Sequence, residues 1–345
     1  MTDTMQSLQL DEWGGGLTAR DVPVPEPTPG EVLIEVEATS VGLTVRNAIN
    51  GDLGDDPAAL PRIPGHEIVG RVTELGSEAL PFDAGDRVAA YFYLVCGRCD
   101  ACLSGHESLC ANFEGFVGVA TDGGYAEYVS LPAESVVRLP DDIDPVAATA
   151  VPDAIATPYH IVSERAGIDP GDDVLVLGAG GGVGIHLVQL ADHFGGEVTA
   201  VDRVDAKLDR CRELGAAHTL NTDEQSLAAF ADSEGIEYDV AVDFTGSMDL
   251  LEESVSALAT RGRLVNLTGF PGRSFDVSPR ELVMDELEVV GSRYCSRYEL
   301  ARSAELVAEG VVEPVVSEVV ELDGVEEMLA TIAAGELVGR GATTP

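Results

Sequence analysis

The amino-acid sequence predicts an α/β protein built from a mostly β, barrel-like domain and a doubly wound parallel-sheet domain. Its 345 residues exceed the usual size of one compact core, so two domains are expected. Residues 1–150 contain short alternating apolar runs separated by turn-rich clusters, which is typical of antiparallel strands. From about Asp169, short β-branched runs alternate with helical patterns, which indicates a parallel sheet covered by helices.

Individual segments support each domain. In the first domain, apolar and polar residues alternate along residues 31–38 and 68–75, and clusters of turn-forming residues lie at 23–30 and 83–86. In the second, we expect strands at 174–177, 198–202, 240–243, 264–267 and 287–290, and helices at 183–194 and 205–214. After Gly291 the pattern returns to the first domain. We therefore assign residues 1–155 and 295–345 to the first domain and residues 156–294 to the second.

The chain carries an extreme acidic charge. It contains 61 Asp and Glu against 20 Lys and Arg, for a formal net charge of −41, and Lys207 is its only lysine. Because the carboxylates are spread over the whole length, we interpret them as a hydrated surface adapted to high salt, where their repulsion is screened. Such a surface argues against a nucleic-acid partner and disfavours an anionic membrane, since counterion displacement requires Lys and Arg.

The sequence also indicates a cytoplasmic protein. Residues 1–16 lack the basic flank and apolar stretch of a signal peptide. Residues 174–191 lack Asp, Glu, Lys and Arg, which is one property of a membrane span. However, five glycines stand between a β-branched run and a helical pattern. This arrangement favours a buried strand, a phosphate loop and a helix.

These glycines form a candidate dinucleotide site. In the register Ala179-x-Gly181-x-x-Gly184, the backbone can approach a pyrophosphate, which the next helix N-terminus would bind. The following strand ends at Asp202, whose carboxylate can accept hydrogen bonds from ribose hydroxyls and would repel a 2′-phosphate, so NAD is favoured over NADP. Arg203 keeps NADP open, because it could contact that phosphate. The predicted cofactor-binding residues are Gly178, Ala179, Gly181, Gly182, Val183, Gly184, Asp202, Arg203 and Lys207.

Four of the six cysteines lie close together, within residues 95–111. Cys96, Cys99, Cys102 and Cys110 have the spacing C-x2-C-x2-C-x7-C. Clustered thiolates of this kind can surround one tetrahedral zinc ion, and four sulfurs leave no open position for catalysis, so the zinc would be structural. An iron–sulfur cluster is the competing use of this spacing.

Several motifs together resemble a known family. Gly65-His66-Glu67 precedes the cysteine lobe, a glycine-rich strand signal follows at residues 122–128, and Val151-Pro152-Asp153 precedes the second domain. Over nearly its whole length the chain resembles the zinc-containing medium-chain alcohol dehydrogenases. The resemblance implies a GroES-like catalytic domain, a Rossmann domain, and a homodimer or homotetramer. It also implies a catalytic zinc held by His66 and Asp153, with Glu67 as a further candidate ligand.

The sequence departs from this family at the first zinc ligand. The family places a cysteine early in the chain, but no cysteine precedes Cys96. Its place falls to Gly42 in one register and to Thr44 in another. In the first register, Thr44 matches the family's proton-relaying hydroxyl, and Val45 replaces the aspartate that orients the histidine. In the second register, Thr44 replaces the cysteine ligand, and Asn47 replaces that aspartate.

Three functional hypotheses follow. With a catalytic zinc, the protein would interconvert an alcohol and an aldehyde or ketone, with hydride passing to the nicotinamide and Thr44 relaying the proton. Without one, hydride could reduce an activated double bond in an enoyl-CoA or a quinone, and residues 151–153 and 184–186 also resemble acryloyl-CoA reductases. A dinucleotide-binding protein without catalysis is the third hypothesis. In each enzymatic case the partner is a small-molecule substrate.

Overall fold

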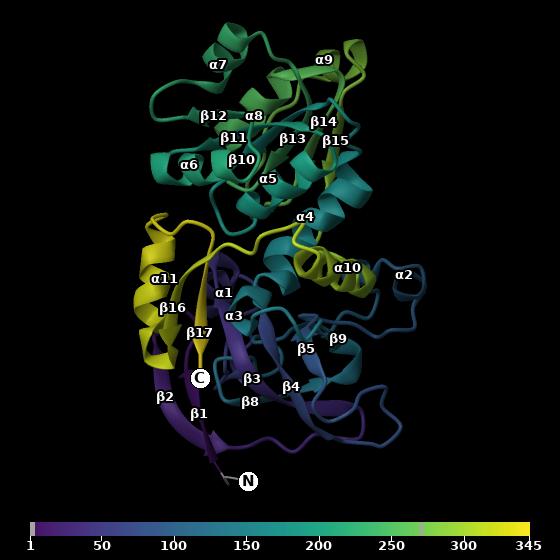
Figure 1. The fold of residues 1–345 in the computed structure, drawn as a ribbon, viewed down its shortest axis with the longest axis vertical. Coiled ribbons are helices and arrows are strands. Elements are labelled where there is room, and N and C mark those ends of the chain that lie inside the picture. The colour runs from purple at the N-terminus through teal and green to yellow at the C-terminus, as the bar shows by residue number, and fades with distance from the viewer. Residues whose placement is uncertain (1–3, 270–271) are drawn as a thin grey trace. The chain divides into compact units, whose positions relative to one another are not determined.

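The computed structural model describes residues 4–269 and 272–345. Internal contacts divide the chain into two compact units. The first unit contains residues 1–156, 295–310 and 314–345, and the second contains residues 157–294 and 311–313. Figure 1 labels the elements of both.

The first unit is built around a seven-stranded, mostly antiparallel sheet. Its strand order is β16-β17-β3-β4-β5-β9, and β8 also pairs with β3. These strands are β3 (Glu31–Val41), β4 (Ile68–Leu75), β5 (Arg87–Ala90), β8 (Tyr128–Pro132), β9 (Val136–Arg138), β16 (Val316–Glu321) and β17 (Arg340–Thr344). Two two-stranded sheets accompany it, formed by β1 (Thr4–Leu10) with β2 (Leu17–Pro23) and by β6 (Tyr93–Leu94) with β7 (Gly115–Phe116).

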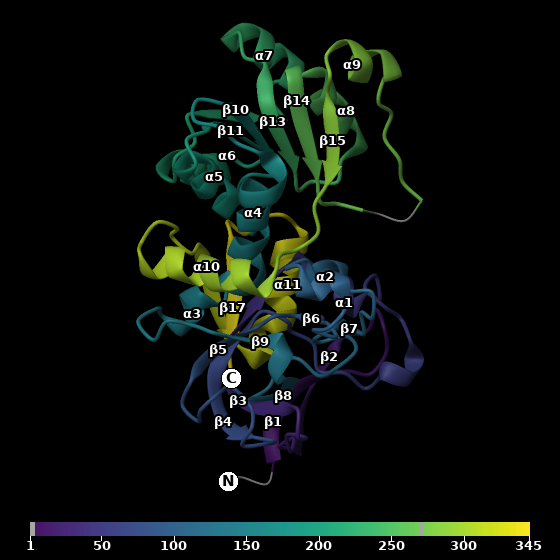
Figure 2. The same ribbon diagram turned by 90° about the vertical axis from the view of Figure 1, so that its right-hand side faces the viewer.

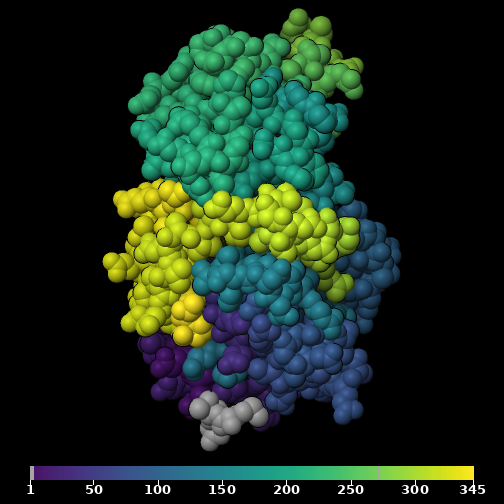
Figure 3. All heavy atoms as spheres, in the orientation of Figure 1, coloured from purple at the N-terminus to yellow at the C-terminus, as the bar shows by residue number. Residues whose placement is uncertain are grey.

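Short helices complete this unit. They are α1 (Leu43–Ile49), α2 (Asp100–Leu103), α3 (Pro145–Ala148), α10 (Arg297–Ala308) and α11 (Val325–Ala333), together with a π-helical turn at Val151–Ile155. The apolar side chains of α1 and α11 share one core with those of β1 and β3. Figure 3 shows the C-terminal residues, in yellow, beside N-terminal residues, in purple. The C-terminal strand β17 pairs with β3, so the end of the chain is an integral part of this unit.

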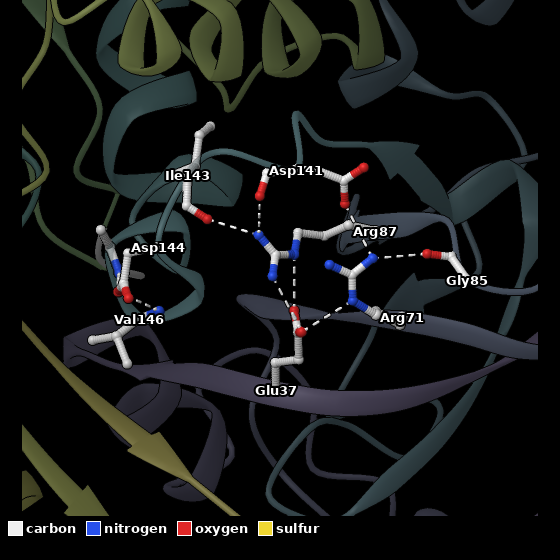
Figure 4. Close-up of polar contacts among 9 residues, drawn as sticks. Glu37, Arg71, Gly85, Arg87, Asp141, Ile143, Asp144 and Val146 are labelled. Atoms are coloured by element: carbon white, nitrogen blue, oxygen red, sulfur yellow. Dashed lines mark hydrogen bonds and ion pairs between the residues drawn. The ribbon is translucent and has the colours of Figure 1, made fainter.

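A buried arginine and a second arginine share one carboxylate and so link three strands of the main sheet. Arg87 of β5 contacts Glu37 of β3, with its Nε atom 3.0 Å from Oε2, and donates hydrogen bonds to the carbonyls of Asp141 and Ile143 (Figure 4). Arg71 of β4 lies on the other side of the same carboxylate, 3.3 Å from Oε1. Arg71 also contacts the Asp141 carboxylate, with Nη1 3.0 Å from Oδ1. Two carboxylates therefore face the two guanidinium groups and compensate their charges.

The second unit contains a six-stranded parallel sheet. Its order is β12-β11-β10-β13-β14-β15, so the chain starts at the centre, moves to one edge and then returns to build the other (Figure 1). Figure 2 shows β13, β14 and β15 side by side. The strands are β10 (Asp173–Leu177), β11 (Glu197–Asp202), β12 (His218–Asn221), β13 (Tyr238–Asp243), β14 (Leu258–Asn266) and β15 (Glu288–Gly291). The helices are α4 (Ala156–His160), whose first residue lies in the first unit, a π-helical turn at Ile161–Ala166, α5 (Gly184–His193), α6 (Asp205–Glu213), α7 (Leu227–Glu234), α8 (Met248–Ser256) and α9 (Pro279–Met284).

The predicted fold class is confirmed, and the expected parallel strands are present. Strand β12 was not predicted from the sequence, because its polar residues His218 and Asn221 interrupt any apolar run at this sheet edge. The glycine-rich stretch at 174–191 is divided between β10 and α5 rather than forming one helix. In the described part of the chain, no helix is long and apolar enough to cross a membrane.

Candidate active site, zinc lobe and cofactor loop

The four clustered cysteines converge on one point in the first unit. The Sγ atom of Cys99 lies 3.5 Å from that of Cys102 and 3.9 Å from that of Cys110, which in turn lies 3.6 Å from that of Cys96. Sulfurs arranged tetrahedrally around zinc, with Zn–S bonds of about 2.3 Å, would lie about 3.8 Å apart. A disulfide would bring two of them to about 2.05 Å. The lobe therefore fits one structural zinc ion.

Hydrogen bonds to the Cys96 sulfur favour its thiolate form, which is the form that binds a metal. The Asn112 amide and the Arg98 backbone N–H donate toward Cys96, which lowers the pKa of that thiol to about 6. Burial raises the pKa of the Cys102 thiol to about 12. A bound dication would favour the thiolate form of both, as metal–thiolate sites do.

The predicted cofactor loop connects β10 to α5 in the second unit. Gly178 has a φ of +77°, a backbone conformation that favours glycine. A Cβ atom on Gly184 would lie only 2.3 Å from the carbonyl oxygen of Gly178, so the loop and the helix approach too closely for a side chain there. Ala179 is fully buried, and Gly181, Gly182 and Val183 complete the turn. This geometry leaves backbone N–H groups at a helix N-terminus, where a pyrophosphate can bind.

Asp202 and Lys207 border this loop. The Oδ2 atom of Asp202 accepts a hydrogen bond of 3.1 Å from the Gly180 N–H, and its Oδ1 atom accepts one of 2.8 Å from the Arg203 N–H. Lys207 packs over Gly180, where a Cβ would meet the lysine's Cβ at 2.2 Å. The Arg203 side chain is exposed. The structure thus brings Asp202 and Lys207 to the glycine loop, with Arg203 beside them in the sequence.

His186, for which no role was predicted from the sequence, also contacts this loop. It is fully buried on α5, and its Nδ1 atom lies 2.8 Å from the carbonyl oxygen of Gly182. The contact ties the first turn of the helix to the loop. Its polar partner explains how a fully buried histidine is accommodated on the apolar face of the helix.

Asp243, which was also not predicted as a site residue, lies at the end of β13, beside the end of β10. It is fully buried, and its carboxylate accepts hydrogen bonds from Thr245, Gly246 and Thr268. The carboxylate therefore fixes the loops that follow β13 and β14, at the carboxyl edge of the sheet where ligands of such sheets bind.

A second polar cluster lies inside the first unit. His66 and Glu67 precede β4, and Asp153 lies on the π-helical turn Val151–Ile155, a feature often found at functional sites. The His66 Nε2 atom lies 4.0 Å from Asp153 Oδ2, and the imidazole lies against the Phe92 ring, with centroids 4.4 Å apart. The structure thus brings together three of the four predicted catalytic residues.

Arg340, at the start of β17, completes this cluster. Its Nη2 atom lies 2.7 Å from Glu67 Oε1 and 3.2 Å from Asp153 Oδ2. All three side chains are buried. Desolvation raises the pKa of Glu67, and the positive charge of Arg340 opposes that rise. Desolvation likewise opposes the charged form of Arg340, but the two carboxylates outweigh it and raise its pKa. The four residues therefore form one coupled group.

Gly42 lies against this group, while Thr44 lies two positions further along. Val41 pairs with Gly341 across β3 and β17, which places Gly42 beside Arg340. A Cβ atom on Gly42 would lie only 1.8 Å from Arg340 Nη1. Thr44 is half-buried on α1, and Val45 belongs to the apolar core of the unit. Gly42, which takes the place of the first ligand in one of the two sequence alignments, thus lies beside the polar cluster.

The residues at this cluster do not fit a catalytic zinc ion as they are arranged. The ligand atoms of His66, Glu67 and Asp153 lie within 4.8 Å of one another, and His66 Nε2 is buried without a hydrogen-bond partner among the described residues, so these side chains alone could surround an ion. However, Gly42 offers no ligand, and the Arg340 guanidinium already contacts both carboxylates. A dication here would lie beside a buried cation, and that repulsion is strong where solvent is excluded.

Arg340 was not predicted as a site residue from the sequence. Its signal is a basic residue between two glycines, in a chain with few basic residues, at the start of an otherwise uncharged strand. Nothing local in the sequence connects it to Glu67, from which it is separated by 273 positions. The other predicted site residues were found from motifs whose members lie close together in the chain.

Comparisons with known proteins agree with this architecture. The family described as alcohol dehydrogenase GroES-like domain matches residues 28–141, and the family described as zinc-binding dehydrogenase matches residues 182–309. An alcohol dehydrogenase of Geobacillus stearothermophilus is 33% identical over 339 residues, which cover 97% of this chain and 98% of that protein.

Solved structures give the same result. The crystal structure of AibC superposes with a TM-score of 0.91 at 30% identity, covering 100% of this chain and 97% of that one. A cobalt- and zinc-bound thermostable alcohol dehydrogenase from Pyrobaculum aerophilum gives a TM-score of 0.88 at 31% identity, covering 99% and 100%. A GroES-like unit joined to a nucleotide-binding unit defines a class of oxidoreductases. Within it, the chain belongs to the zinc-binding, medium-chain alcohol dehydrogenase family.

Proposed function

We propose that the protein is an NAD(H)-dependent dehydrogenase that interconverts an alcohol and its aldehyde or ketone by hydride transfer. The observation that carries the proposal is the buried pair His66 and Asp153, whose Nε2 and Oδ2 atoms lie 4.0 Å apart. A hydroxyl oxygen bound beside this pair could exchange its proton with His66 Nε2. The similarity to an alcohol dehydrogenase over 97% of the chain supports the same reaction.

The cofactor assignment follows from the glycine loop and Asp202. The loop presents backbone N–H groups to a pyrophosphate, and Asp202 provides a carboxylate near the place expected for the adenosine ribose. That carboxylate would repel the 2′-phosphate of NADP. A bound nicotinamide would supply the hydride chemistry, as acceptor in alcohol oxidation and as donor in carbonyl reduction.

The chain's own residues would bind the substrate oxygen and move its proton. In oxidation, the alcohol O–H proton passes to His66 Nε2 as the C–H bond breaks, and in reduction it returns to the developing alkoxide. The Phe92 ring packs against the imidazole and restricts its orientation. The carboxylate of Asp153 would stabilise the imidazolium that proton transfer produces. Thr44 remains a candidate for relaying this proton to solvent.

A second candidate, reduction of an enoyl thioester, is favoured by one observation. Arg340 and Gly42 occupy the region where a first zinc ligand is expected, and a guanidinium can stabilise an enolate without any metal. Both candidates use the same cofactor loop and differ in the substrate atom that receives the hydride.

The acidic surface supports a protein that works in concentrated salt in the cytoplasm. The net charge of −41 fits neither nucleic acid nor an anionic membrane surface as a partner. A homodimer or homotetramer is the assembly that the family resemblance implies.

The test is NADH oxidation in concentrated KCl with a panel of aldehydes, ketones and enoyl-CoA thioesters. Turnover of a carbonyl compound, with the reverse reaction on the matching alcohol, supports the dehydrogenase. Reduction of the enoyl thioesters alone would overturn it. The variant His66→Asn should lose about 100-fold in kcat, as expected for loss of a general acid or base. His193→Asn, at an exposed helix end, is the matched control.

A further inference from the structure

We propose that the guanidinium of Arg340 replaces the catalytic zinc ion in this protein, and that Gly42 provides the space for it. The inference concerns the site assigned above and so rests on the proposed function. It identifies the cation that acts there, and it implies that the protein holds one zinc ion per chain, in the cysteine lobe.

Space is the reason for glycine at position 42. A Cβ atom there would lie 1.8 Å from Arg340 Nη1 and 2.9 Å from Cζ, so any side chain would displace the guanidinium. The backbone does not require glycine, because its φ of −152° is an extended conformation that any residue adopts. Close approach of the arginine is the constraint that remains.

Charge explains why the guanidinium stays in this position. Glu67 is fully buried and Asp153 nearly so, and two carboxylates this close together in a dry site need a compensating cation. Arg340 Nη2 contacts both, at 2.7 and 3.2 Å. Here the cation is part of the chain, so it cannot be removed by a chelator.

The backbone around Arg340 is also built to hold it. Its N–H donates to the Val315 carbonyl, 2.9 Å away. On one side Gly339 has a φ of +68°. On the other, a Cβ on Gly341 would meet the Met328 sulfur at 2.1 Å. The strand therefore lies close to its neighbours on both sides of Arg340. These contacts fix the position of the Arg340 backbone, from which the side chain extends.

A fixed guanidinium can perform the electrostatic part of the reaction. Negative charge develops on the substrate oxygen as an alkoxide or enolate forms, and a preorganised cation stabilises that charge most strongly where water is excluded. Arginine retains its proton throughout the physiological pH range, so this stabilisation would not depend on pH. The proton itself would still pass through His66.

The test is zinc content, measured by elemental analysis after purification in concentrated KCl without chelator. The wild-type protein should contain one zinc per chain, and His66→Ala should also contain one. The double variant Gly42→Cys/Arg340→Met restores a thiol and removes the guanidinium, so it should contain two. Adding His66→Ala to it should return the count to one. NADH binding, followed by fluorescence, reports whether each variant is folded.

Two zinc ions in the wild-type protein, falling to one in His66→Ala, would overturn the proposal. So would a folded double variant that holds only one. If the double variant does not fold, the comparison between wild type and His66→Ala still decides. The zinc count does not depend on knowing the substrate, so failure to turn over carbonyl compounds would overturn the proposed function while leaving this inference to be judged separately.

Discussion

The carboxylate of Asp202 accepts a hydrogen bond from the N–H of Gly180 across 3.1 Å, so the end of β11 is tied to the glycine loop that follows β10. One oxygen of this carboxylate holds the loop, and the other accepts the N–H groups of Arg203 and Val204. Asp202 thus has a structural role in the loop as well as the proposed contact with a ribose.

Replacing Asp202 should change cofactor selectivity. Asp202→Ala removes the acceptor for the ribose hydroxyls and the repulsion of a 2′-phosphate, so the Kd for NADH should rise about tenfold or more, as expected for loss of a charged hydrogen bond. The Kd for NADPH should fall. Fluorescence titration with both cofactors measures this preference. Asp202→Asn is the matched control, because it keeps a hydrogen-bond acceptor but loses the charge. An unchanged ratio of the two Kd values in Asp202→Ala would contradict the NAD assignment.

The sequence predicted those parts of the site whose residues are close together in the chain. The four clustered cysteines lie within residues 95–111, and the glycine loop is continuous with its strand and helix. The spacing of residues in each short segment was therefore enough to predict the site. The strands of the parallel sheet were similarly visible from their apolar runs. At its edge, β12 was not, because its pairing with β11 depends on the neighbouring strand rather than on its own composition.

The ion pair of Arg340 with Glu67 could not be predicted in this way. It depends on β17 pairing with β3, which joins segments about 300 positions apart, as in the bond from Ser40 to Gly341. The sequence shows that a zinc ligand is missing at Gly42, but it does not reveal which side chain fills the space beside this glycine. Long-range strand pairing and close packing are properties of the folded chain. They bring the positive charge of Arg340 to this site.

Removing one sulfur should empty the zinc lobe. In Cys110→Ser the metal loses one of four thiolate ligands, so zinc content should fall from about one to well below one-half per chain, with a Tm lower by 5 °C or more. Elemental analysis and thermal unfolding measure the two effects. Cys211→Ser removes a buried thiol on α6 outside the lobe and serves as the control. Full zinc retention in Cys110→Ser would refute a four-cysteine site.

Asp173 should destabilise the second unit at neutral pH. It pairs directly with Glu197 across β10 and β11, and its N–H donates to Asp239. Desolvation, together with repulsion from Glu197 and Asp239, raises the pKa of Asp173 in the folded state. A carboxyl with a raised pKa binds its proton more tightly when folded. Asp173 therefore contributes to the stability of the folded state at low pH. This contribution is lost as the pH rises through the pKa that Asp173 has in the folded state.

Asp173→Asn should therefore raise the Tm at pH 7 by about 1–3 °C and have little effect near pH 3, where the wild-type carboxyl is also protonated. Glu197→Gln removes one of the repelling charges and should give part of the same gain. The two substitutions combined should gain less than their sum, because they relieve one shared repulsion. Thermal unfolding at the two pH values measures all three. A larger effect at pH 3 than at pH 7 would mean that the sign is wrong.

Concentrated salt should stabilise the whole protein. With 61 acidic and 20 basic residues, the folded chain concentrates negative charge that is more widely separated after unfolding. The Debye length falls from about 10 Å at 0.1 M to about 3 Å at 1 M, so screening should raise the Tm steeply over this range. KCl and sodium sulfate at equal ionic strength should agree below about 0.5 M if screening dominates. A much larger gain with sulfate would instead indicate general strengthening of apolar burial, and a Tm that is flat with KCl would contradict adaptation to salt.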